Sequence, residues 1–268
     1  NNNSGNATVY FMENPQGKTV ELGVAINAIR GGPSGDCRNA DGSGCVDHVT
    51  IKGLVFEKFA TVAQRGVINP RYYNHSGDIG NYWVIEQNDF RWNHGLAVRG
   101  SAHSRVRNNL IYKTGNSGAE IGQHSLMEGN EFSENNYAGY YKGWSAGALK
   151  VVGTLYTNIR GNYATDNDGH GMWTDIDNYH VVYENNISTN NNGDGFKHEI
   201  SYDCTIRNNV GFGNYHDPYK SAPWGSFILV QNSSFCDVYG NKGEVSKICE
   251  SPETCRVKGN GIYILEQS

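Results

Sequence analysis

Two short segments of the chain concentrate side chains that could catalyse a reaction: Trp173–Asp177 (WTDID) and Lys197–Ser201 (KHEIS). Asp175 and Glu199 hold equivalent places in these segments, 24 residues apart. If the segments are adjacent strands, the two carboxylates lie at about strand spacing, close to the ~5–5.5 Å separation in retaining glycosidases. Repulsion between such close charges favours one protonated and one ionised group. The pair therefore predicts the acid and nucleophile of a glycoside hydrolase.

Lys150 suggests a different chemistry on the same face. A lysine beside two acids could remove the proton α to the carboxylate of a uronic acid and so cleave a glycan by elimination. Asp175, Asp177 and Glu199 would then hold a hard cation such as Ca²⁺, which neutralises that carboxylate. If the repeats differ in length by one residue, the neighbour of Asp175 on the next coil is His198 and not Glu199. We favour elimination because a lysine accompanies the acids, and a purely structural stack of ion pairs is the alternative.

Aromatic and polar residues near the same segments could bind sugar rings. Aromatic rings offer flat apolar faces, and the charged groups offer hydrogen bonds to hydroxyl and carboxylate groups. The expected sugar-binding residues are Trp144, Trp173, Tyr141, Tyr202, Glu120 and Lys197.

These residues must be positioned by a repeat that runs along most of the chain. An aliphatic, a polar and a small residue precede an asparagine at steps of 19–32 residues, which is typical of solenoid coils. Asparagine at a fixed turn can pass amide hydrogen bonds from coil to coil, and glycine supplies the positive φ of such corners. The sequence predicts one all-β domain over residues 1–268, a right-handed parallel β-helix of about 8–9 coils. The repeated asparagines are Asn88, Asn109, Asn130, Asn162, Asn186, Asn209, Asn241 and Asn260.

The residues around the repeat predict which side chains face outward. Strict alternation in the glycine-led strands directs Met172, Ile176, Phe196 and Ile200 inward. The side chains directed outward are Trp173, Asp175, Asp177, Lys197, Glu199 and Ser201, joined by Glu120 and Lys150 on earlier coils. The position two residues before each repeated asparagine alternates in charge, which predicts a column of attractive neighbours that fixes strand register. This column consists of Glu86, Arg107, Glu128, Arg160, Glu184, Arg207, Tyr239 and Lys258.

The six cysteines fit the same register. Cys204, Cys236 and Cys255 each lie five residues before a repeated asparagine, so neighbours in this column are close enough for a disulfide. The simplest pairing is Cys204–Cys236, Cys249–Cys255 and Cys37–Cys45, and Cys236–Cys255 is the alternative. Residues 1–46 are expected to form an irregular N-terminal coil with a Gly-rich disulfide loop, and residues 242–268 a C-terminal cap.

Composition and charge exclude several classes of protein. The 268 residues carry a net charge of −5, which gives no basic surface for nucleic acid, and no apolar stretch has the length of a membrane span. The cysteines form no C-x-x-C pair, so disulfides in a secreted protein are expected rather than zinc. No amphipathic helix precedes the first coil, so its open edge could pair with a second copy. Candidate glycosylation sites are Asn2, Asn6, Asn74, Asn186 and Asn232.

Three motifs resemble those of secreted bacterial right-handed parallel β-helix repeat proteins of the pectate-lyase-like superfamily. They are Gly143–Gly147 (GWSAG), Trp173–Asn178 (WTDIDN) and His198–Asp203 (HEISYD), and the resemblance covers roughly residues 45–268. Most such proteins have no assigned activity, and the superfamily includes polysaccharide lyases, glycoside hydrolases, uronate epimerases and non-catalytic surface proteins. Relatives often carry an acid at the place of Ser145. The resemblance therefore implies a lost or altered activity here if that acid is catalytic.

Together these observations predict a secreted carbohydrate-active protein that binds an extended polysaccharide on the face bearing Lys150, Asp175 and Glu199. A polysaccharide lyase is the leading prediction. The alternatives are a glycoside hydrolase that uses Asp175 and Glu199, a sugar-binding module, and a structural or adhesive extracellular protein that assembles through its coil ends.

Overall fold

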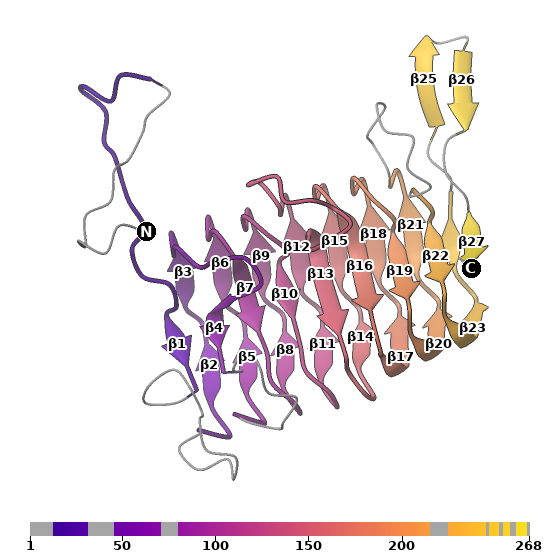
Figure 1. Ribbon diagram of the computed structural model, residues 1–268, viewed down its shortest axis with the longest axis horizontal. Helices are drawn as coiled ribbons and strands as arrows, with labels where there is room; N and C mark the ends of the chain where they lie inside the picture. The colour runs from indigo at the N-terminus through magenta and orange to yellow at the C-terminus, as the bar shows by residue number, and fades with distance from the viewer. Residues whose placement is uncertain are drawn as a thin grey trace.

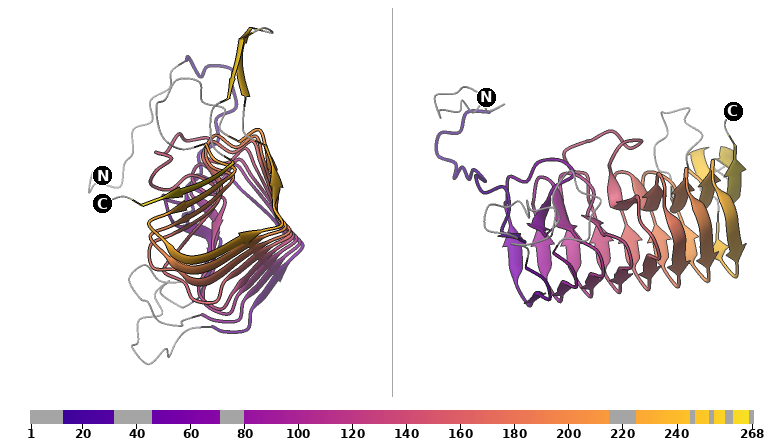
Figure 2. Two further views of the ribbon diagram at one scale, coloured as in Figure 1. Left: turned by 90° about the vertical axis from the view of Figure 1, so that its right-hand side faces the viewer. Right: turned by 60° about the horizontal axis from the view of Figure 1, so that its bottom comes forward.

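The computed structural model describes residues 13–31, 46–70, 80–214, 225–244, 247–251, 254–257 and 261–266. These residues form 27 strands, and no helix that could cross a membrane occurs among them. Nearly all of the strands stack into one long prism, which runs from β1 at one end to β27 at the other (Figure 1). Viewed along the stack, successive coils overlay one another (Figure 2).

Three parallel sheets form the walls of this prism; each coil up to β24 contributes one strand to each sheet, and β27 adds a ninth strand to one of them. Sheets of nine, eight and eight strands agree with the expected 8–9 coils and confirm the parallel β-helix. Sheet A contains β1 (Ile29–Arg30), β4 (Gly66–Asn69), β7 (Leu96–Arg99), β10 (Ala119–Glu120), β13 (Gly147–Val152), β16 (His170–Asp175), β19 (Phe196–Glu199), β22 (Ile228–Gln231) and β27 (Ile262–Leu265). Sheet B contains β2 (Thr50–Lys52), β5 (Val84–Glu86), β8 (Arg105–Arg107), β11 (Leu126–Glu128), β14 (Asn158–Arg160), β17 (Tyr179–Glu184), β20 (Tyr202–Arg207) and β23 (Ser234–Tyr239). Sheet C contains β3 (Val55–Glu57), β6 (Asp89–Arg91), β9 (Leu110–Tyr112), β12 (Glu131–Ser133), β15 (Tyr163–Thr165), β18 (Ile187–Thr189), β21 (Val210–Phe212) and β24 (Lys242–Gly243).

Asparagines form the expected ladder at the corner between sheets B and C. The backbone N and Nδ2 of each ladder residue donate to Oδ1 of the asparagine in the next coil, at 2.9–3.1 Å, from Asn88 to Asn241. The residue before each ladder position has a positive φ, as at Gln87 (56°) and Gly129 (63°). Asn260 lies outside the described residues. Asn186 is completely buried in this ladder, so glycosylation there is incompatible with the fold.

A second ladder, which the sequence analysis missed, occupies the corner between sheets C and A. Asn135, Asn167 and Asn191 each donate through N and Nδ2 to the next coil's Oδ1, and the ladder ends at Asn214. Thr114 donates to Asn135 in the same way. Two of the three corners of the helix are therefore tied by continuous side-chain hydrogen bonds.

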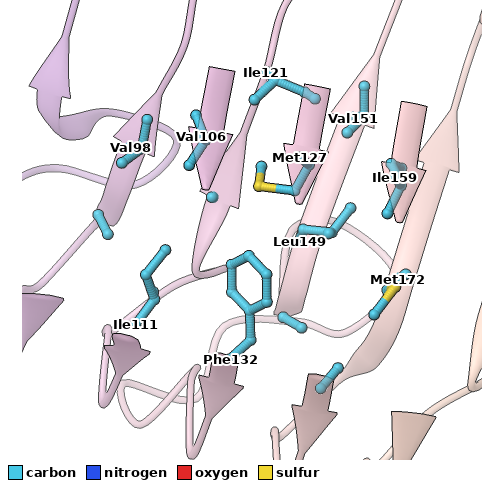
Figure 3. Close-up of a cluster of buried hydrophobic side chains, with 14 of the residues drawn as sticks. Val98, Val106, Ile111, Ile121, Met127, Phe132, Leu149, Val151, Ile159 and Met172 are labelled. Carbon is cyan, nitrogen blue, oxygen red and sulfur yellow. The ribbon is translucent and has the colours of Figure 1, made fainter. Parts of the chain in front are cut away.

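The core fills the space between the three sheets. Figure 3 shows Ile121, directly after β10 of sheet A, together with Met127 from sheet B and Phe132 from sheet C, which meet as one layer of the interior. All three are completely buried. Stacking such layers buries each coil against two neighbours, which no coil could achieve alone.

The charged column has the expected register on sheet B. Glu86, Arg107, Glu128 and Arg160 are successive partners in β5, β8, β11 and β14. Arg107 Nε lies 2.7 Å from Glu86 Oε2, and Arg160 Nε lies 2.8 Å from Glu128 Oε1. The column therefore places opposite charges in contact as the sequence predicts, although Lys258 lies outside the described residues.

The predicted disulfide between Cys204 and Cys236 is confirmed. Cys37 and Cys45 lie outside the described residues. Cys249 and Cys255 are opposite each other in an antiparallel hairpin of β25 (Lys247–Ser251) and β26 (Thr254–Val257), whose side chains are not described. After this hairpin the chain returns to pair β27 with β22, so the region after residue 242 continues sheet A as well as ending the helix.

Candidate functional site

Three of the four predicted catalytic residues, Lys150, Asp175 and Glu199, come together on the outer face of sheet A. Lys150 pairs with Trp173, which pairs with Lys197 on the following strand. Two residues further on, Asp175 pairs with Glu199. The strands β13, β16 and β19 thus place the two carboxylates on adjacent coils, as the repeat predicts.

Each carboxylate of this cluster contacts its own lysine. Lys150 Nζ lies 2.7 Å from Asp175 Oδ2, and Lys197 Nζ lies 2.7 Å from Glu199 Oε2. The indole of Trp173 lies between the two ammonium groups, with its ring centroid 3.7 Å from Lys150 Nζ and 4.4 Å from Lys197 Nζ. The result is a continuous stack of ion pairs and cation–π contacts across three coils.

The cluster is closely packed. Trp173 and Lys197 are each 1 % exposed and Asp175 is 6 % exposed. Lys150 Nζ also donates to the Trp144 carbonyl oxygen at 2.6 Å. A general base needs a nitrogen lone pair directed at substrate, whereas this nitrogen is directed at a carboxylate, a carbonyl and an indole face. The burial and the saturated contacts of Lys150 are those expected of a structural ion-pair stack. The adjacent carboxylates of Asp175 and Glu199 are those expected of a catalytic site.

His198 does not belong to this outer face. It pairs with Thr174, and its side chain points into the interior, where it is completely buried. Its Nδ1 lies 2.7 Å from Thr174 Oγ1, and burial lowers the pKa of His198 to about 4. The one-residue shift that would have put His198 beside Asp175 does not occur.

The corner after Asp175 also differs from strict alternation. Ile176 and Ile200 were expected to point inward, but both are 45 % exposed. Each has a positive φ (58° and 49°), so the strand ends at the residue before it rather than continuing through it. The isoleucine side chain therefore turns outward. Asp177, also at positive φ (54°), is exposed at this corner.

The acidic residues do not converge as a calcium site would require. Asp175 and Glu199 face lysines, and Asp177 lies beyond the corner. In the described part of the chain, one group of three potential metal-ligating side chains has its ligand atoms within 4.8 Å of one another: His198, Cys204 and Cys236.

The remaining predicted binding residues are dispersed. Tyr141 and Trp144 are exposed in the turn that precedes β13, and Trp144 lies near Tyr140. Tyr202 is exposed at the start of β20, on sheet B. Glu120 is nearly buried on β10 and contacts Arg99, with 3.4 Å between Oε2 and Nε.

A stack of aromatic rings that the sequence analysis missed follows the corner between sheets A and B. Neighbouring rings in this stack are nearly parallel, with centroids 4.5–5.2 Å apart. Every member has a positive φ, which turns its side chain away from the core. The ring stack consists of His48, Tyr82, His103, His124, Tyr156 and His180.

Beside the ring stack, the outer face of sheet B carries a groove of about 620 Å³. Its positive charges are Arg105, Arg107 and Arg160, and its negative charge is Glu128. Arg107 and Arg160 are held by the charged column, whereas Arg105 is exposed and has no carboxylate partner among the described residues. The lining is completed by Tyr82, Val84, His103, Ser104, His124, Ser125, Leu126 and Asn158. The groove, to which we refer as the sheet B groove, is therefore open and polar, and Arg105 is its one cation without a carboxylate partner among the described residues.

Comparison with known proteins identifies the family of the chain. Residues 72–242 match the family model described as "Right handed beta helix region". The chain belongs to this family. No curated protein matches it.

Two solved structures are similar to this β-helix. One, described as the complex of XylC with xylose, is 12 % identical, with a TM-score of 0.44, and the alignment covers 77 % of this chain and 55 % of that chain. The other is an alginate lyase from Paenibacillus sp. str. FPU-7, which is 13 % identical, with a TM-score of 0.39. This alignment covers 82 % of this chain and 91 % of that chain. The chain thus spans about half the length of the first of these proteins.

Proposed function

We propose that this member of the β-helix family binds an extended acidic polysaccharide in the sheet B groove. The observation that supports the proposal is Arg105, an exposed cation in this groove that has no carboxylate partner among the described residues, in a chain whose net charge is −5. Arginine is well suited to carboxylate and sulfate groups because its planar fork can donate two parallel hydrogen bonds.

The shape of the groove also favours a long, thin ligand. It crosses β5, β8, β11 and β14, which are successive strands of sheet B. At a strand spacing of about 4.8 Å, these four strands extend over about 14 Å. The edges of the ring stack add imidazole nitrogens and a tyrosine hydroxyl along one side, which can exchange hydrogen bonds with sugar hydroxyls.

We further propose that the protein acts outside the cell. Disulfides persist in oxidising compartments, and the Cys204–Cys236 disulfide is consistent with one.

Binding is tested by calorimetric titration with polygalacturonate, alginate and a neutral glucan. Arg105→Ala should weaken the binding of the acidic glycans roughly tenfold, the loss of about one charge-assisted hydrogen bond. Lys242→Ala is the matched control, because Lys242 is exposed on sheet C and its removal changes the net charge equally. Equal affinities for the wild type and Arg105→Ala would exclude the sheet B groove as the binding surface.

Cleavage at sheet A is a second candidate function. It is supported by the pairing of Asp175 with Glu199 on adjacent coils, with the exposed aromatic side chains of Tyr141 and Trp144 nearby in sequence. A screen of the same glycans with and without Ca²⁺ would record unsaturated products and reducing ends. A lyase raises both signals and a hydrolase raises reducing ends alone, and Lys150→Ala or Asp175→Asn should abolish either activity.

The binding and cleavage tests also separate the other classes of function. Glycan binding without products identifies a sugar-binding module. Neither binding nor products, together with self-association measured by light scattering, would favour a structural or adhesive protein that assembles through the N-terminal coil edge.

A further inference from the structure

Three potential metal ligands meet inside the helix, on the opposite side of sheet A from the lysine cluster. Cys204 and Cys236 are cross-strand partners in β20 and β23, with their Cα atoms 4.4 Å apart, and they form a disulfide. His198, from β19, points toward them from the facing wall, and the nitrogen and two sulfurs lie within 4.8 Å of one another. These side chains come from three strands of two adjacent sheets, so the β-helix itself fixes their relative positions.

One ring nitrogen of His198 has no hydrogen-bond partner in the part of the chain that the structure describes. This nitrogen is Nε2, and the side chain that carries it is completely buried. A buried polar atom without a partner costs free energy, so its persistence calls for a physical reason. The ring is also held in place, because Nδ1 lies 2.7 Å from Thr174 Oγ1.

The hydrogen bonds around His198 engage one ring nitrogen and leave the other. The Tyr183 hydroxyl donates to the Lys197 carbonyl oxygen at 3.0 Å and to Thr174 Oγ1 at 2.8 Å, which holds the Thr174 side chain in place. Thr174 Oγ1 in turn forms the hydrogen bond with His198 Nδ1. Because Nδ1 is engaged in this way, Nε2 is the nitrogen left to ligate a metal.

We propose that reduction of the Cys204–Cys236 disulfide converts this cluster into a zinc site of two thiolates and the His198 Nε2. Two equivalents of an external thiol reduce the disulfide to two protein thiols and become one disulfide themselves. Binding of Zn²⁺ then releases the two thiol protons. The two electrons thus come from the external thiol, and the metal keeps its oxidation state.

The chemistry of the ligands favours Zn²⁺ over harder cations. Thiolate and imidazole are its preferred ligands, and Cys₂His with an open fourth position is a known arrangement. Two thiolates also neutralise the charge of the ion, which matters because Cys204 is 1 % exposed. Cys236 is half-buried, so solvent can approach the fourth position from its side.

Zinc-like geometry requires ligand atoms about 3.3–3.8 Å apart around bonds of about 2.0–2.3 Å. The three atoms already lie within 4.8 Å. Once the S–S bond is broken, the sulfurs can separate without a change of register, because adjacent parallel strands are about 4.8 Å apart.

The test uses the full chain with Cys37, Cys45, Cys249 and Cys255 replaced by serine, so that one cysteine pair remains. The protein is reduced with a phosphine without oxygen and titrated with Co²⁺, whose thiolate charge-transfer and d–d bands report tetrahedral sulfur coordination. We expect one equivalent to bind, with displacement by Zn²⁺, and no bands with the oxidised protein. Cys204→Ser should abolish the charge-transfer band, and His198→Gln should weaken Co²⁺ binding at least tenfold with altered d–d bands.

The control variant is His124→Gln, which removes an imidazole from the ring stack and should leave the titration unchanged. Far-ultraviolet circular dichroism of the reduced protein should retain its β-sheet signal, since the two asparagine ladders do not depend on the disulfide. Absence of thiolate–Co²⁺ bands in the reduced protein, unchanged binding by His198→Gln, or loss of the β-sheet signal on reduction would each overturn the proposal.

Discussion

At the scale of single residues, a buried asparagine side chain forms hydrogen bonds to neighbouring coils that the backbone of a turn alone could not form. Asn130 is 1 % exposed, and its Nδ2 donates both to Val106 O at 2.8 Å and to Asn162 Oδ1 at 3.1 Å. Its Oδ1 accepts from N and Nδ2 of Asn109. One side chain therefore satisfies buried groups in three successive coils, so its loss should be felt beyond its own coil.

Replacing Asn130 with alanine is expected to reduce the free energy of unfolding by about 3 kcal/mol or more, because it leaves several buried donors and acceptors unsatisfied at about 1–3 kcal/mol each. Urea denaturation followed by circular dichroism measures this change. Glu131→Ala, at the adjacent exposed position, is the control and should stay within about 0.5 kcal/mol. A loss for Asn130→Ala no larger than for Glu131→Ala would show that the ladder does not stabilise the fold.

At the scale of elements, glycine allows strands of neighbouring coils to approach at the corners. A Cβ on Gly118, just before β10, would lie 2.5 Å from Ala148 O and 2.7 Å from Phe132 Cδ1. The first of these atoms belongs to the backbone of the next coil, which the parallel ladder holds in place. The spacing of the coils therefore depends on the absence of a side chain here.

We expect Gly118→Ala to destabilise the protein by about 1–3 kcal/mol through overpacking. Adding Phe132→Leu should not restore stability, because the nearest obstacle is a carbonyl oxygen rather than the phenyl ring. Gly261→Ala is the control, since a Cβ there meets nothing within 4 Å. The unfolding temperatures of the wild type, Gly118→Ala, Gly118→Ala with Phe132→Leu, and Gly261→Ala test this expectation. Recovery of stability on adding Phe132→Leu would show that crowding against the phenyl ring alone limits this position.

The sequence allowed the coils, the sheet B charge column and one disulfide to be predicted, because each repeats in phase with the first asparagine ladder. The same phase contained two further signals. Each residue of the second ladder lies five residues after a residue of the first ladder, as Asn135 follows Asn130. From Tyr82 onward, each residue of the ring stack lies six residues before a residue of the first ladder, as His124 precedes Asn130. The corner at Ile176 was mispredicted because its positive φ interrupts alternation, and the packing of Lys150 depends on a long-range contact with Trp144.

At the scale of the whole molecule, two buried histidines link stability to pH. Burial lowers the pKa of His198 to about 4, and it also lowers the pKa of His170, where contact with Asp194 partly opposes the effect. Both side chains are completely buried, on adjacent strands of sheet A. The folded protein thus keeps both rings neutral at a pH at which the unfolded chain, with an ordinary pKa of about 6.5, is already protonated.

The free energy of unfolding should therefore fall as the pH falls from about 6.5 toward 4, because in this range the unfolded chain binds more protons than the folded protein. Between pH 7.5 and pH 5, His198 alone should account for about 2 kcal/mol, at about 1.4 kcal/mol per pKa unit. Urea denaturation of the oxidised protein at several pH values in this range measures the slope, above the pH at which carboxylates ordinarily titrate. His198→Gln should make the slope shallower. An identical slope for the wild type and His198→Gln would mean that this ring takes up its proton in the folded protein, which would require water or a partner at Nε2.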